Sequence, residues 1–303
     1  PDQPPYGVSG AVDRLSDVLI MKFRTEIESV KGSFTIDHSG SILLLGSCFT
    51  DNVGSRLGRD GFDAAFNPMG PLYNPASLAR YIRDIVSRRS YRESDFRSDC
   101  DGIFHCLDFA SRYRDSDASV LADRLNRDMD NLRCLYGNAK TVVVTFGSSI
   151  VYSLSDFIGD TVGNCHKFPS RMFSRLALTV EDIAGLWRPL LEEMRLQGKN
   201  VILTVSPIRH LADGLHGNEL SKARLLLACE ALGGLCDYFP SYEIMIDDLR
   251  DYRFYDSDMK HPSEVACDYI YEKFSQLYFT RDTQARAVVE RERSLRAAHR
   301  PIL

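Results

Sequence analysis

The stretch Ser41-Ile42-Leu43-Leu44-Leu45-Gly46-Ser47-Cys48-Phe49-Thr50 joins an apolar strand to the start of a helix. The apolar run before Gly46 has the composition of a buried strand, and the segment from Asp51 to Gly58 favours a helix. We therefore expect Ser47 at a strand C-terminus and a helix N-terminus together. Free backbone N–H groups and the helix dipole favour negative charge at such a junction.

A second polar motif, Asp258-Met259-Lys260-His261-Pro262, lies far downstream. The spacing lets Asp258 accept the Nδ1 proton of His261, which leaves Nε2 to face a serine hydroxyl. Serine, aspartate and histidine are the residues of an acyl-transfer triad. Either motif alone would more often be a helix cap or a packing feature. Their joint occurrence predicts one active-site cleft, with Ser47 as nucleophile and His261 as general base.

Strands and helices alternate along the rest of the chain. The residue pattern predicts strands at 42–45, 63–66, 141–146, 200–205 and 241–246, and helices at 75–88, 118–135, 180–196 and 217–232. Thr179 and Asp182 form a predicted capping pair for the third of these helices. Apolar strands separated by helices indicate a parallel sheet covered on both faces, whose ligand crevice lies outside the carboxyl ends of the strands.

The chain of 303 residues is long enough for one α/β domain with insertions. Residues 1–20 are expected to form a poorly ordered N-terminal extension, and residues 21–280 the single domain. Residues 281–303 alternate Arg and Glu, which predicts a solvated or partner-facing charged helix or tail. Segments near 90–113 and 151–174 are too long for simple connections and are predicted to shape a substrate pocket.

The composition disfavours several classes of partner. The formal net charge of -5 leaves no basic footprint for nucleic acid, and no apolar run approaches the length of about 20 residues that spans a bilayer. Neither a nucleic acid nor a membrane is therefore expected as a partner, and the oligomeric state stays open. The eight cysteines are scattered without a Cys-x-x-Cys pair. This favours free thiols and, together with an N-terminus that lacks a signal pattern, a cytoplasmic location.

These motifs resemble those of a known family. The stretch 46–50 is similar to the signature of the GSCFA family, and the resemblance continues through 67–75, 164–167, 206–210, 238–243 and the Asp258/His261 turn. That family is related to the SGNH (GDSL-like) esterases and acetylhydrolases. The resemblance implies a flavodoxin-like three-layer α/β/α sandwich with a mainly parallel five-stranded sheet, and Ser47 as nucleophile. The Gly-x-Ser-x-Gly elbow of the α/β-hydrolases is absent, which disfavours that family.

An oxyanion hole needs preorganised hydrogen-bond donors. We predict two backbone donors, the N–H of Ser47 at the helix start and the N–H of Gly70, in a loop where glycine allows a close approach. SGNH enzymes generally add an asparagine after the third strand, but here that strand is followed by Gly147-Ser148-Ser149. Asn164 is the predicted substitute, with a turn former as the alternative interpretation.

Further candidates surround these motifs. His166, Lys167, Arg209 and His210 are predicted to contact substrate, and Arg209 suits bidentate anion recognition, although a structural salt bridge is an equal alternative. Cys48 is a competing nucleophile, because a helix N-terminus lowers a thiol pKa, with packing as the favoured alternative. A metal site from Cys165, His166, His210 and His216 lacks a recognised ligand spacing. No metal and no cofactor are predicted.

The sequence thus predicts a serine hydrolase that cleaves an ester through Ser47, His261 and Asp258 and an acyl-enzyme. The resemblance suggests a small-molecule or carbohydrate ester, such as an O-acetyl group on a sugar, and nothing in the residues selects it. An O-acyltransferase would use the same residues. A non-catalytic binding module on the same fold is the other alternative.

Overall fold

The computed structural model describes residues 25–28, 31–155 and 157–298 of the chain. Its centre is a five-stranded sheet in which every pairing is parallel. In spatial order the strands are β2 (Ala64–Phe66), β1 (Ser41–Gly46), β6 (Ala139–Phe146), β10 (Asn200–Val205) and β11 (Asp237–Phe239). In chain order this is the flavodoxin-like arrangement 2-1-3-4-5. The predicted fold class is confirmed.

The predicted position of the fifth strand of the sheet is wrong. Residues 241–246, predicted as a strand, start with the helical turn α6 (Ser241–Glu243) and continue into a π-helix at Ile244–Asp248. The edge strand β11 lies just before them. Tyr242, Ile244 and Met245 are all buried, and a short apolar run cannot distinguish a buried strand from a buried helical turn.

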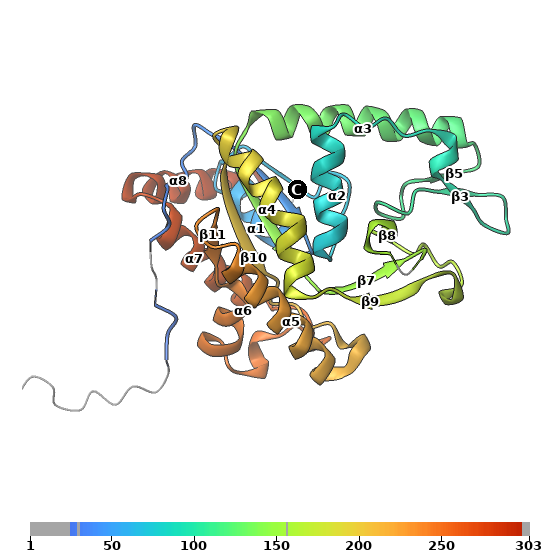
Figure 1. Cartoon of the computed structure of the whole chain (residues 1–303). Helices are drawn as coiled ribbons and strands as arrows, with labels where there is room; N and C mark the ends of the chain where they lie inside the picture. The colour runs from blue at the N-terminus through green and yellow to red at the C-terminus, as the bar shows by residue number, and fades with distance from the viewer. Residues whose placement is uncertain (1–24, 29–30, 156, 299–303) are drawn as a thin grey trace, which may run out of the picture.

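Helices cover both faces of the sheet (Figure 1). On one face, α2 (Pro75–Val86), α3 (Ala118–Asn138), α4 (Val180–Leu196) and α5 (Gly214–Ala231) share a core with Leu43 and Leu45. On the other face, α1 (Phe49–Arg59) and α7 (Glu264–Tyr278) share a core with Ile42 and Leu44. Because successive side chains of a strand point to opposite faces, β1 contributes to both cores.

The predicted helices are confirmed within a few residues at their ends. The bounds predicted for α4 coincide with those observed, and its predicted capping pair is present. The N–H of Asp182 donates to Oγ1 of Thr179 at 3.1 Å, and the N–H of Thr179 donates to the Asp182 carboxylate at 2.9 Å. Short 3₁₀ turns lie at Glu93–Asp95, Ile158–Asp160, Ser170–Met172, Leu211–Asp213 and Tyr252–Phe254.

The two predicted insertions carry small antiparallel sheets of their own. In the first, β3 (Arg97–Ser98) pairs with β4 (Phe104–His105), which also pairs with β5 (Arg114–Asp115). The second holds β7 (Ile150–Ser153), β8 (Thr161–Val162) and β9 (Ser174–Ala177). Both project from the same side of the layered core (Figure 1). They touch each other, because the N–H groups of Gly163 and Asn164 donate to the carbonyl of Leu107 at 2.8 and 2.9 Å.

The C-terminal segment predicted as a charged helix or tail forms the helix α8 (Arg281–Ala298), and one side of this helix packs on the domain. Ala287 is buried, and the guanidinium of Arg291 donates to both carboxylate oxygens of Asp60 at 2.8 and 2.5 Å. Asp60 is fully buried and also accepts from the hydroxyl of Tyr271 at 3.0 Å. The alternation of Arg and Glu conceals this contact, because a single arginine makes it.

The predicted extension at residues 1–20 lies outside the described residues. All eight cysteines are free, and Cys106, Cys229 and Cys267 are buried. Across the described ranges, no helix combines the length and the apolar character that crossing a bilayer requires.

We predict that Arg291→Ala destabilises the fold, because it leaves the Asp60 carboxylate buried without its main cationic partner. Breaking a buried ion pair costs about 3–5 kcal/mol, and the partial exposure of Arg291 reduces this to roughly 1–3 kcal/mol. Urea unfolding would measure the loss. Arg293→Ala is the matched control, because it removes only an exposed pair with Glu290 on the same helix. Equal losses in the two variants would contradict the docking role of Arg291.

Candidate active site

The end of β1 adopts a backbone conformation that glycine alone reaches without strain. Gly46 has φ +144°, and a Cβ atom there would lie 2.3 Å from the carbonyl oxygen of Thr145 on the neighbouring strand β6. The missing side chain allows β1 to turn directly toward α1. Ser47 follows at the carboxyl end of the strand, as predicted, with a buried side chain.

Asn67, in the loop after β2, fixes this turn from the side. Its Oδ1 accepts from the N–H of Gly46 at 2.9 Å, and its Nδ2 donates to the carbonyl of Ser47 at 3.3 Å. Nδ2 also donates to the carboxylate of Asp51 in the first turn of α1 at 2.8 Å. One buried amide thus ties the strand end, the serine and the helix start together. Asn67 is the first residue of the 67–75 motif, to which the sequence analysis assigned no role.

Asp258 and His261 form the predicted pair. Oδ2 of Asp258 lies 2.6 Å from Nδ1 of His261, and Oδ1 accepts from the N–H groups of Lys260 and His261 at 2.9 and 3.0 Å. These backbone donors, together with the imidazole, hold the pKa of the Asp258 carboxyl well below its usual range. The carboxylate orients the ring, so that Nε2 is the nitrogen left for chemistry.

The free nitrogen of the His261 imidazole lies near the thiol of Cys48, whereas the sequence predicts that it faces the hydroxyl of Ser47. Nε2 of His261 is 3.7 Å from Sγ of Cys48. Oγ of Ser47 accepts only a long hydrogen bond from the N–H of Phe49, at 3.3 Å. Among the described residues no hydrogen bond joins His261 to Ser47, although both line one cavity. The predicted serine–histidine contact is therefore not made in this structure.

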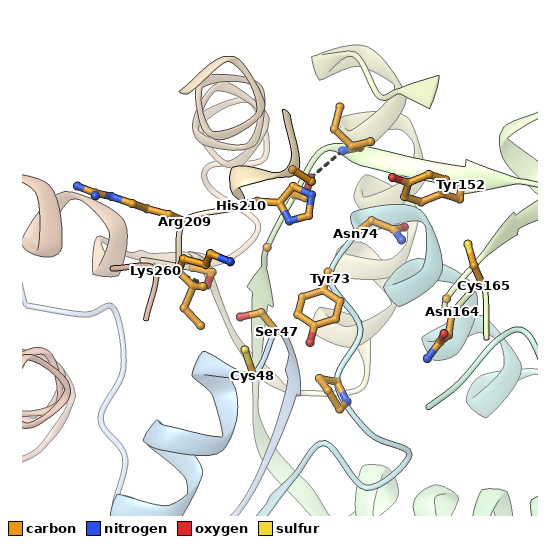
Figure 2. Close-up of a pocket in the computed structure, with 18 of the residues that line it drawn as sticks. Ser47, Cys48, Tyr73, Asn74, Tyr152, Asn164, Cys165, Arg209, His210 and Lys260 are labelled. Carbon is orange, nitrogen blue, oxygen red and sulfur yellow. Dashed lines mark hydrogen bonds between the residues drawn. The ribbon is translucent and has the colours of Figure 1, made fainter. Parts of the chain in front are cut away.

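The cavity has a volume of about 720 Å³ and lies at the carboxyl ends of the central strands. Residues that follow β1, β6 and β10 line it, among them Ser47, Gly147 and Ser206. In a parallel sheet of this order, ligands bind at the switch point between the first and third strands, here β1 and β6. Figure 2 shows Ser47 and Cys48 on one wall, with Tyr152 from the second insertion on another.

Tyr73, to which the sequence analysis gave no role, lies beside the Ser47–Cys48 junction. Its hydroxyl lies close to the thiol of Cys48, and Figure 2 shows the phenol ring beside Ser47. Burial raises the pKa of the Cys48 thiol, and it raises the pKa of Tyr73 to about 12. Both groups therefore hold their protons at neutral pH. A protonated thiol is a poor nucleophile, whereas a protonated phenol is a hydrogen-bond donor.

The backbone donors predicted for an oxyanion are already engaged. The N–H of Gly70 donates to the carbonyl of Asn67 at 2.8 Å, and Gly70 does not line the cavity. The predicted role of Gly70 is wrong, because its φ of +90° serves a tight turn that consumes the N–H. The N–H of Ser47 donates to the carbonyl of Thr145 at 3.2 Å.

The predicted residues of the second insertion divide into two groups. Asn164 lines the cavity, but its Oδ1 accepts from the N–H of His166 at 2.9 Å, the turn-forming alternative. His166 lies outside the cavity lining, where its Nε2 contacts the carbonyl of Cys106 at 2.6 Å and burial lowers its pKa. Lys167 is exposed and also lies outside the lining. A contact of His166 or Lys167 with a ligand in this cavity is therefore not supported.

The remaining predicted residues, Arg209 and His210, do line the cavity. They follow β10, and the N–H of His210 donates to Oδ1 of Asn218 at 2.9 Å. Within the described part of the chain, no cluster of three or more His, Cys, Asp or Glu side chains has an arrangement that could hold a metal ion.

Lys222, on α5, lies beneath the floor of the cavity. It is 1% exposed, and its Nζ donates to the carbonyls of Gly147 and Ser206 at 2.8 and 2.6 Å. Burial lowers its pKa to about 7. A neutral amine has two N–H groups, which suffice for both acceptors. Lys222 therefore joins the ends of β6 and β10 at the site, and only the folded chain brings these carbonyls to it.

This lysine predicts a pH dependence of stability. Its pKa falls from about 10.4 in an unfolded chain to about 7 in the fold. Between these values the unfolded chain binds more protons, so the Lys222 contribution to the free energy of unfolding rises with pH through this window. Lys222→Met should lack that rise. Urea unfolding of both proteins at about pH 7 and about pH 9 tests this, and equal pH slopes would contradict it.

Comparisons with known proteins give one family match. A model of the GSCFA family matches residues 41–274. A search of curated proteins finds no match.

Several solved structures show distant similarity. The esterase EstA from Pseudoalteromonas sp. is 8% identical, with a TM-score of 0.37 over 79% of this chain and 96% of its own. A catalytic mutant of the acetylxylan esterase Axe2 from Geobacillus stearothermophilus is 11% identical, with a TM-score of 0.38 over 82% and 98%. LAE5, an alpha/beta hydrolase enzyme from the metagenome of Lake Arreo, Spain, is 14% identical, with a TM-score of 0.36 over 80% and 96%. Because these TM-scores are low, we infer nothing about this chain from these three proteins.

Proposed function

This chain belongs to the GSCFA family, and we propose that it is a serine hydrolase of ester bonds that uses Ser47, His261 and Asp258. One observation carries the proposal. The Asp258–His261 pair turns its free nitrogen toward the Ser47-Cys48 junction, at the carboxyl ends of the parallel strands. Small-molecule or carbohydrate esters, O-acetyl esters of sugars among them, are the substrate class that we propose.

The reaction follows from the roles of the three side chains. His261 takes the proton of Ser47, Oγ attacks the ester carbonyl, and Asp258 stabilises the imidazolium. The imidazolium then donates its proton to the leaving alcohol, and water releases the acyl group in a second step. Ser47 must rotate toward His261, which costs little because its present hydrogen bond is 3.3 Å long. Catalytic hydrogen bonds are often loose in free enzymes and tighten with substrate.

Cys48 is the second candidate for the nucleophile, because its sulfur is the atom near His261 Nε2. Two observations favour Ser47. Burial raises the pKa of the Cys48 thiol, which keeps it protonated. The backbone of Ser47 is held by Asn67 directly after Gly46, whose positive φ suits glycine alone.

We predict that Ser47→Ala abolishes both hydrolysis of short-chain aryl esters and labelling by a fluorophosphonate probe. Cys48→Ala should keep most of both, because its thiol is not required for attack. Mass spectrometry of the labelled peptide identifies the modified residue, and an iodoacetamide probe reports the thiol. A fluorophosphonate adduct on Cys48, or equal loss in the two variants, would exclude the serine assignment.

The Tyr73 hydroxyl is the donor that we propose for the oxyanion, in place of Gly70. It remains protonated at neutral pH and lies beside the junction. Phenols are among the side chains that serve in oxyanion holes. During the reaction the hydroxyl would donate a hydrogen bond to the developing oxyanion.

Tyr73→Phe removes only this hydroxyl, so kcat should fall by roughly 10²-fold while the melting temperature changes little. Tyr152→Phe is the matched control, because Tyr152 lines the same cavity from the second insertion. Ester hydrolysis assays compare the three proteins. A similar, small effect of both substitutions would remove Tyr73 from the mechanism.

A further inference from the structure

The cavity carries an uneven distribution of charge. Its lining contains Arg209, His210 and Lys260 besides the proposed base His261. Within the described chain, no Asp or Glu is among the residues that line it. The protein as a whole carries a net charge of -5, so a cavity with basic side chains alone is a local feature. Walls of one sign concentrate ligands of the opposite sign.

Lys260 is anchored beside the proposed catalytic pair. Its N–H donates to Oδ1 of Asp258 at 2.9 Å, and its carbonyl accepts from the N–H of Arg209 at 3.1 Å. Figure 2 shows its ammonium in the region of the cavity that contains Ser47 and His210. No ion pair involving its ammonium is present in the described part of the chain. The backbone is thus fixed on both sides while the charge is left for a ligand.

Arg209 also lines the cavity, but Figure 2 shows its guanidinium directed away from Ser47 and Lys260. Its guanidinium lies 4.0 Å from the ring centre of Tyr255 and 5.2 Å from that of Tyr252. Such cation–π contacts orient the side chain without neutralising its charge. Throughout the described ranges, its guanidinium has no carboxylate within ion-pair distance.

The acidic groups closest in the chain are already paired. Asp258 accepts from His261 and two backbone N–H groups. Asp213 lies 4.0 Å from Nε2 of His210, but it is bound by the guanidinium of Arg175. In the described chain, neither carboxylate forms an ion pair with the ammonium of Lys260.

We propose that the substrate is an ester that carries a carboxylate within about one sugar unit of the scissile bond, with Lys260 as its principal contact. His210 would complete the anion site. This inference rests on the proposed ester hydrolysis for its reaction, and on the charge of the cavity for its substrate class. A volume of about 720 Å³ accommodates a ligand of sugar size.

Two pairs of esters test the charge preference. The first pair, para-acetoxybenzoate and its methyl ester, varies charge on the alcohol part. The second, para-nitrophenyl hemiglutarate and para-nitrophenyl pentanoate, varies charge on the acyl part. In at least one pair, Lys260→Met should lower kcat/KM for the anionic ester about 10-fold more than for the neutral ester. Lys260→Arg should retain the preference, and added salt should weaken it in the unmodified protein.

Lys140→Met is the control for net charge, because this exposed lysine at the start of β6 lies outside the cavity. It should leave the ratio between anionic and neutral esters unchanged. Equal losses for both members of each pair would show that Lys260 supports the reaction itself, and no loss would show that it contacts no substrate. Either result overturns the proposal.

A binding measurement separates this inference from the proposed function. In Ser47→Ala, calorimetric titration with glutarate and para-hydroxybenzoate is compared with titration of the neutral esters dimethyl glutarate and methyl para-hydroxybenzoate. At least one acid should bind about 10-fold more tightly than its ester, and Lys260→Met in the same background should remove the difference. Binding that ignores charge overturns the anion site. A retained preference in a protein without esterase activity would instead reject the hydrolase and leave the anion site standing.

Discussion

The absence of a side chain at Gly46 is the constraint on which the site depends. A Cβ atom there would collide with the carbonyl of Thr145, so no other residue lets β1 and β6 stay paired while the chain turns at once into α1. The amide of Asn67 then locks this turn. As a result, Ser47 stands at the switch point of the sheet with a fixed backbone, and only its side chain is left to move.

Burial and local donors give the polar groups around this turn different protonation states. Burial raises the pKa values of the Cys48 thiol and the Tyr73 phenol, so both groups stay neutral. Lys222 is buried among carbonyls, and its pKa falls. The carboxyl of Asp258 is solvated and receives two backbone N–H groups, so its pKa falls and it stays charged. The charges that remain at the cavity are therefore those at its rim.

The site is assembled from segments that are distant in the chain. The β1–α1 turn supplies the proposed nucleophile, the loop after β2 supplies Tyr73, and the turn before α7 supplies the imidazole. Contacts beyond the sheet hold this arrangement. Lys222 joins the ends of β6 and β10, and Arg291 secures α8 against the buried carboxylate of Asp60. The insertions close one wall, where Asn164 and Tyr152 line the cavity.

Features that arise from neighbouring residues were predictable from the sequence alone. Apolar periodicity indicated four of the five central strands, and the three-residue spacing of Asp258 and His261 predicted their pairing. The expected donor Gly70 was wrong because hydrogen bonding within its own turn uses the N–H. Tertiary structure alone decided that His261 faces Cys48 and that Lys222 lies beneath the site. It also decided that the ammonium of Lys260 has no ion-pair partner in the described part of the chain. The physical reason is that such contacts join residues far apart in the chain, whose distance and burial exist only once the sheet has brought them together.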